Sequence, residues 1–228
     1  ITEDEAKDFD TILSKAKVAF SLQNSWYING FYDGLSLFGE KGNDADAGMV
    51  FPKDGADITS YLVDVVANPN FSNDDGASGL AAIKDGSADV LFSGTWSAKD
   101  VKEALGDNYA ATSLPTFTVN GQKKQMKSFA ATKAAAYNPN AKNPKAAAQF
   151  AAYLGSTEAQ KLHYEMRAIP PTDKSLSDLT TDDVAAKAQA DTMANTALLQ
   201  SGLSGMNDWW TPAETFGKAL VNKEITKD

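Results

Sequence analysis

Short apolar segments alternate along the chain with longer segments in which apolar side chains recur at helical spacing. Residues 17–23 and 88–93 have strand character, and residues 24–38 and 96–105, which follow them, have helical periodicity. Because strands that alternate with helices pack as layers, the sequence predicts an α/β fold.

Further elements follow from local signals. Asn120-Gly121 is a strong turn signal and predicts a hairpin over residues 117–125. Thr2 and Glu5 form a capping box, and Thr157 and Gln160 form another. The other predicted strands are 109–114 and 126–137, and the other predicted helices are 2–16, 58–66, 79–84, 144–154, 157–166, 182–199 and 206–222.

Composition excludes several kinds of chemistry. Apolar residues make up 43% of the 228 residues, enough for a core, yet no stretch approaches the roughly 18 apolar residues of a membrane helix. The absence of cysteine and the single histidine, His163, exclude disulfides, thiolate catalysis and multi-histidine metal sites. A net charge of −9 with one arginine, Arg167, argues against a nucleic-acid partner. We expect neither a metal nor a cofactor.

Catalytic signals are weak. His163 lies in a predicted helix between apolar and aromatic neighbours, which favours a structural role. The chain contains no G-x-S-x-G sequence, no Walker loop and no G-x-G-x-x-G sequence. A pair of carboxylates could still serve a glycoside hydrolase, whose two acids lie about 5–9.5 Å apart, so that alternative stays open.

The tryptophans lie at the boundaries of predicted elements. Trp26 and Trp96 each follow a predicted strand, and Trp209-Trp210 follows a glycine-rich turn. Ligands of α/β sheets bind beyond the carboxyl ends of the strands. An indole has a flat apolar face and one N–H at its rim, which suits the C–H face and polar edge of a sugar ring. Two interpretations are open: these residues anchor the core, or they line a carbohydrate-binding cleft.

Residues 88–98, ADVLFSGTWSA, resemble a segment of the extracellular solute-binding proteins of carbohydrate ABC transporters, of the maltose/maltodextrin-binding type. The similarity extends, in the family's order, from about residue 17 to the end of the chain. Further similar segments are LPTF at 114–117, KSFA at 127–130, NPKAAAQF at 143–150, the E-x-Q…P segment at 158–170, and residues 206–216.

This resemblance implies an α/β fold of the type II periplasmic-binding-protein-like class, in which two lobes hold a sugar between them. The chain is expected to comprise the C-terminal lobe plus a remnant of the N-terminal lobe, whose first hundred-odd residues would be missing. Residues 1–107 would form the first part of the C-terminal lobe, residues 108–170 the return into the N-terminal lobe, and residues 171–228 the closing helices of the C-terminal lobe.

The resemblance also implies a ligand site. Trp26 stands at a position where the family has a stacking tyrosine, Trp96 at its central stacking tryptophan, and Trp210 at a late aromatic position. Asn24 stands where many members have a carboxylate, although an amide can both donate and accept hydrogen bonds. Glu214 stands where some members have a basic residue, so no role is carried over to it. The predicted ligand-binding residues are Asn24, Trp26, Tyr27, Trp96, Trp209 and Trp210.

The function implied is non-catalytic. We expect the protein to bind an oligosaccharide, a maltose or maltodextrin, outside the cell and to deliver it to the permease of an ABC importer. It would be a Gram-positive cell-surface lipoprotein or a periplasmic protein, in contact with the membrane only through a lipid anchor on the parent protein. The alternatives are a binding protein for a different sugar or polyol, a glycoside hydrolase, and a surface adhesion module.

Overall fold

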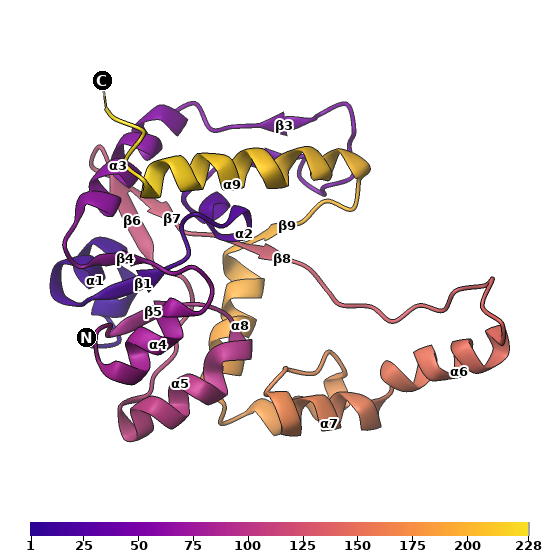
Figure 1. The fold of residues 1–228 in the computed structure, drawn as a ribbon. Coiled ribbons are helices and arrows are strands. Elements are labelled where there is room, and N and C mark those ends of the chain that lie inside the picture. Colours follow the sequence, from indigo (N-terminus) through magenta and orange to yellow (C-terminus); the bar gives the residue numbers. More distant parts are fainter. Residues whose placement is uncertain (228) are drawn as a thin grey trace.

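The computed structural model describes residues 1–227, and its main body is built around a three-stranded parallel sheet (Figure 1). The strand order is β4 (Phe71–Asn73), β1 (Val18–Phe20) and β5 (Val90–Phe92). Phe20 pairs with Asn73 on one side and with Phe92 on the other. All three strands therefore end at the same edge of the sheet.

Helices and aromatic side chains pack around this sheet. α4 (Ser78–Asp85) packs against β1 and β5, and α3 (Gly55–Ala67) packs against β4 and α9 (Asn207–Val221). The core is rich in phenylalanine. Phe9 makes edge-to-face contacts with Phe31 and Phe92, each with a centroid separation of 5.5 Å. Such pairs add directional packing to the burial of apolar area.

Three small two-stranded sheets surround the main one. β6 (Thr116–Val119) and β7 (Gln122–Gln125) form the predicted hairpin, in which Asn120 and Gly121 both have positive φ. β8 (Ser128–Ala130) pairs in parallel with β9 (Ala197–Leu199). The other elements are α1 (Phe9–Lys15), α2 (Ser25–Ile28), β2 (Ser36–Leu37), β3 (Met49–Val50), α5 (Ala98–Leu105), α8 (Val184–Asn195) and the 3-10 helices Glu5–Lys7, Asn29–Phe31, Thr95–Ser97, Gly106–Asn108, Lys174–Thr180 and Ser204–Met206.

α6 (Pro144–Leu154) and α7 (Thr157–Arg167) lie away from the sheet at the end of the extended segment that follows β8 (Figure 1). α6 buries none of its residues. Phe150 on α6 is 62% exposed and Met166 on α7 is 67% exposed. Two neighbouring helices therefore present large apolar side chains to solvent.

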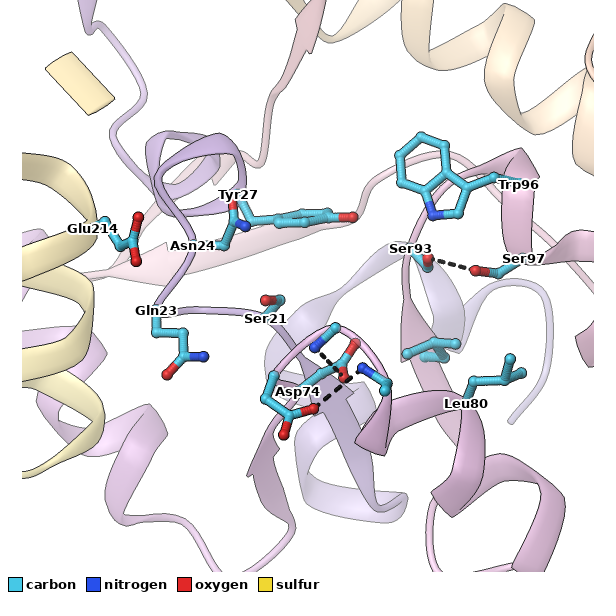
Figure 2. A pocket seen from close by; sticks show the side chains of 14 residues that line it. Ser21, Gln23, Asn24, Tyr27, Asp74, Leu80, Ser93, Trp96, Ser97 and Glu214 are labelled. Atoms are coloured by element: carbon cyan, nitrogen blue, oxygen red, sulfur yellow. Dashed lines mark hydrogen bonds between the residues drawn. The ribbon is translucent and has the colours of Figure 1, made fainter. Parts of the chain in front are cut away.

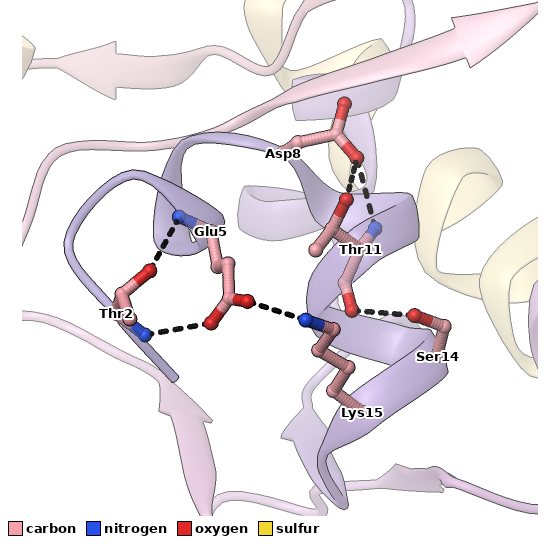
Figure 3. A network of polar contacts seen from close by, with 6 residues as sticks. All are labelled: Thr2, Glu5, Asp8, Thr11, Ser14 and Lys15. Atoms are coloured by element: carbon pink, nitrogen blue, oxygen red, sulfur yellow. Dashed lines mark hydrogen bonds and ion pairs between the residues drawn. The ribbon is translucent and has the colours of Figure 1, made fainter.

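The first predicted helix is wrong in its bounds. The Thr2–Glu5 capping box forms, with both backbone-to-side-chain bonds present, but it leads into a 3-10 turn (Figure 3). α1 begins later because Asp8 caps it: its carboxylate accepts from the Thr11 N–H at 2.8 Å. The second box also shifts by one residue, since Ser156 caps α7.

Three other predicted elements differ from the structure. Residues 109–114 form no strand, because no neighbouring strand pairs with them. The predicted strand 126–137 is reduced to β8, and the end of the predicted helix 182–199 becomes β9, since each of these segments supplies the other's partner. The segment 24–38 combines α2, a 3-10 turn and β2 instead of one helix. Within residues 1–227 no helix is long and apolar enough to cross a membrane.

Candidate ligand-binding site

A cavity of about 530 Å³ opens at the edge where the three parallel strands end (Figure 2). Ser21 follows β1 directly, Asp74 follows β4 and Ser93 follows β5, and all three line the cavity. This is the edge of a parallel sheet at which ligands are expected. The full lining is Ser21, Gln23, Asn24, Tyr27, Asp74, Asp75, Gly76, Ala77, Leu80, Leu91, Ser93, Trp96, Ser97 and Glu214.

Trp96 forms the aromatic wall of this cavity. It lies in the 3-10 turn Thr95–Ser97, and its side chain is 60% exposed. The ring lies over Gly94, where a Cβ atom would be only 2.2 Å from the indole. The hydroxyls of Ser93 and Ser97, 3.0 Å apart, join the two ends of the turn. Gly94 therefore lets the indole lie close to the backbone with one face free for a ligand.

Asp74 and Asp75 shape the opposite side. One Asp74 oxygen accepts from the backbone N–H groups of Gly76 and Gly79, both at 2.9 Å, and so holds the loop that starts α4. Asp75 accepts from the N–H groups of Ser78 at 3.0 Å and Ala77 at 3.2 Å. These backbone bonds hold the pKa of Asp75 below its usual range, so this exposed carboxylate is ionised at neutral pH.

Tyr27 and Asn24 come from α2. The Tyr27 ring is half-buried, and burial raises the pKa of its hydroxyl, so it is a neutral hydrogen-bonding group at neutral pH. The side-chain oxygen of Asn24 accepts from the Trp26 N–H at 2.8 Å and caps α2. Its amide nitrogen has no partner among residues 1–227 and is free to donate to a ligand.

The other tryptophans lie outside the lining of this cavity. Trp26 and Trp210 are half-buried and nearly parallel, with centroids 6.3 Å apart and planes 11° apart, and both contact Phe129. Trp209 is 5% exposed and donates its indole N–H to the Ser25 carbonyl at 3.1 Å. Of the predicted residues, the structure therefore brings Asn24, Tyr27 and Trp96 to the cavity. It gives Trp209 a packing role, because no face of that ring is free.

Sequence reasoning missed the polar part of the site. Ser21, Gln23, Asp74 and Asp75 line the cavity, and Glu214 joins them from α9. Asp74 and Asp75 were hidden because β4 has only three residues, too few for a periodic pattern. The signal that could have found Gln23 was its place at the end of the predicted strand 17–23. Among residues 1–227, no group of three or more His, Cys, Asp or Glu side chains could hold a metal ion.

Comparison with known proteins agrees with this geometry. Residues 1–194 match the family model described as bacterial extracellular solute-binding protein, and the chain belongs to this family. The family binds solutes and is non-catalytic, so the predicted non-catalytic function is confirmed and the glycoside hydrolase alternative is excluded. No curated protein matches the chain.

Solved structures confirm the predicted fold class and the resemblance to maltodextrin-binding proteins. One structure, whose title reads "with acarbose", is 40% identical with a TM-score of 0.94, and the match covers 100% of this chain and 62% of the other. The maltodextrin-binding protein MalE1 from L. casei BL23 is 23% identical with a TM-score of 0.79, again over 100% and 62%. The maltose-maltodextrin binding protein of Alicyclobacillus acidocaldarius is 17% identical with a TM-score of 0.75, over 97% and 62%. The chain therefore spans about 62% of the length of these relatives.

Proposed function

We propose that the protein binds an α-linked gluco-oligosaccharide, such as a maltodextrin, and delivers it outside the cell to the permease of an ABC importer. The observation that carries this proposal is the exposed indole of Trp96 on the wall of a polar cavity at the carboxyl edge of the sheet. An indole face and a polar edge are the two surfaces that a sugar ring requires. The relatives solved with acarbose or named as maltodextrin-binding proteins support this class of ligand.

The cavity described above is one side of the proposed binding cleft. The match covers 62% of each of these relatives and so leaves more than a third of their chain without a counterpart here. We infer that residues 1–107 and 171–228 form one lobe, and that residues 108–170 return into a second lobe that closes over the sugar. The position of α6 and α7 away from the first lobe (Figure 1) and their exposed apolar side chains support that arrangement.

The free energy that Trp96 contributes to binding follows from the apolar sugar surface that its indole covers. Covering ~40–60 Å² of apolar sugar surface is worth about 1–1.5 kcal/mol at ~25 cal/mol per Å². Millimolar affinity needs about 4 kcal/mol and micromolar affinity about 8 kcal/mol, so the present chain should bind at about millimolar concentration or more weakly. Closure by a second lobe would supply the rest.

The test is a calorimetric titration of the chain with maltotetraose. Trp96→Ala should weaken binding by about tenfold, because the stacking surface is lost. Tyr137→Ala removes another half-exposed aromatic side chain, remote from the cavity lining, and should leave the affinity unchanged. Equal affinities for the Trp96→Ala variant and the parent would refute the proposal. Tighter binding of a different sugar or polyol in the same titration would keep the site and change its ligand.

A further inference from the structure

The floor of the cavity holds a polar group without a partner. Ser21 is 5% exposed and lies between Asn24 and the Asp74 loop (Figure 2). No hydrogen bond joins its hydroxyl to any group among residues 1–227. The Ser21 oxygen is not one of the fully buried unpartnered atoms, so solvent in the cavity reaches it and a ligand that enters the cavity can replace that solvent as its hydrogen-bond partner. The position of Ser21 therefore favours a ligand with hydrogen-bonding groups that reach the floor of the cavity.

The charge around that floor is of one sign. The lining contains three carboxylates, from Asp74, Asp75 and Glu214, and no lysine, arginine or histidine. Glu214 has a cation beside it, because Lys218 pairs with it at 2.5 Å on α9. Asp74 is occupied by backbone N–H groups. Asp75 also accepts backbone N–H groups, but it has no cationic partner within residues 1–227 and, unlike the buried Asp74, its carboxylate is exposed at the cavity.

We propose that the cavity selects saccharides by charge, binding one with a protonated amine more tightly than its neutral counterpart and one with a carboxylate more weakly. Ser21 supplies the hydrogen bond common to all three, and Asp75 supplies the discrimination. This inference rests on the proposed function, since it assumes that the ligand is a saccharide.

The physical basis is Coulombic. An ammonium group on the ligand would lie near an ionised carboxylate at the mouth of a partly enclosed cavity, whereas a carboxylate on the ligand would meet like charge there. Exposed pairs of this kind change affinity by about twofold to fivefold. Salt should reduce the discrimination, because charges at such a site are screened over about 10 Å at 0.1 M ionic strength.

The test uses three ligands that differ at one group: maltitol, 1-amino-1-deoxymaltitol and maltobionate. Each is titrated into the 228-residue chain at pH 7 and low salt, followed by the NMR signals of the four indole N–H groups. The amine should bind about twofold to fivefold more tightly than maltitol, and maltobionate more weakly by a similar factor. In 0.5 M NaCl the three affinities should converge.

Two variants separate the roles of the two residues. Asp75→Asn keeps an oxygen for the bonds to Ala77 and Ser78, and it should bring the amine-to-maltitol ratio close to one. The matched control Glu103→Gln, on an exposed position of α5 outside the lining, should keep the parent's ratio. Ser21→Ala should weaken all three ligands together, by about twofold to tenfold, with an unchanged melting temperature because its hydroxyl has no protein partner.

The outcomes distinguish this inference from the proposed function. Equal affinities for the three ligands at low salt overturn the charge selection and leave saccharide binding in place. Binding of the amine without binding of maltitol supports charge selection and overturns the neutral glucan as ligand. If none of the three ligands binds, both the charge selection and the proposed function are refuted. An unchanged affinity in Ser21→Ala overturns the role of the floor hydroxyl.

Discussion

Gly217 is the point at which α9 touches the segment between β1 and α2. A Cβ atom at this position would lie 2.7 Å from the carbonyl oxygen of Leu22 and 2.9 Å from the Cα atom of Gln23. Both are backbone atoms, so they cannot move aside as a flexible side chain can. The close approach places α9, which carries Glu214, beside the cavity.

Gly217→Ala should therefore destabilise the fold. Overpacking of a tight contact costs about 1–3 kcal/mol. The higher helix propensity of alanine offsets part of this cost, because alanine in place of glycine stabilises a helix by up to about 1 kcal/mol. Because the clash is with backbone atoms, the cost lies in the upper half of that range, about 2–3 kcal/mol, and the net loss is about 1–2 kcal/mol. For a chain of this length such a loss lowers the melting temperature by about 2–8 °C. Ligand affinity should fall as well, because α9 carries Glu214 to the cavity.

Thermal unfolding followed by circular dichroism measures the effect. Thr215→Ala is the matched control, since Thr215 lies on the same helix with an exposed side chain. It introduces the same residue without a clash and should not lower the melting temperature. A Gly217→Ala variant that melts at or above the parent temperature would show that the close packing of α9 on Leu22 and Gln23 does not hold the helix.

Three further predictions concern other parts of the chain. Gly94→Ala should weaken maltotetraose binding by about as much as loss of the Trp96 stack, roughly tenfold, because the new Cβ displaces the indole; an unchanged calorimetric affinity would contradict this. The Lys15 ammonium and the Thr2 backbone lower the pKa of Glu5 from 4.5 to about 2, so the stability that this contact adds is fully present above pH 4.5 and is lost as the pH falls towards 2. A carboxyl NMR titration should return that low value, and Lys15→Gln should move it back up. The apolar side chains of α6 and α7 should drive weak self-association of the chain, visible as concentration-dependent light scattering and reduced by Phe150→Gln; scattering that does not change with concentration would argue against it.

Elements with local signals could be predicted from the sequence. The hairpin at Asn120-Gly121 forms because both residues adopt positive φ, which glycine and asparagine tolerate best. α6 has the predicted bounds, because Asn143 caps it, Pro144 fits its first position and alanines continue it. In these segments the conformation depends on neighbouring residues alone.

Short strands could not be predicted in the same way. β4 and β9 have three residues each, and each forms because a parallel partner lies beside it. The strand expected at residues 109–114 has a similar local pattern and lacks such a partner. Backbone hydrogen bonds between segments distant in sequence decide these cases, and no local window contains them.

The adjacent residues Trp209 and Trp210 show what the sequence alone could not predict about the site. Their side chains are identical, yet the first is buried and bonded to Ser25 while the second lies half-exposed against Trp26. By itself the sequence determined the alternation of strands and helices, several caps and turns, and the candidacy of Trp96 as a ligand-binding aromatic residue; its exposure came from the structure. Only the tertiary structure decided which side chains share the cavity, because parallel pairing of β4, β1 and β5 brings Ser21, Asp74 and Ser93 to one edge from distant parts of the chain.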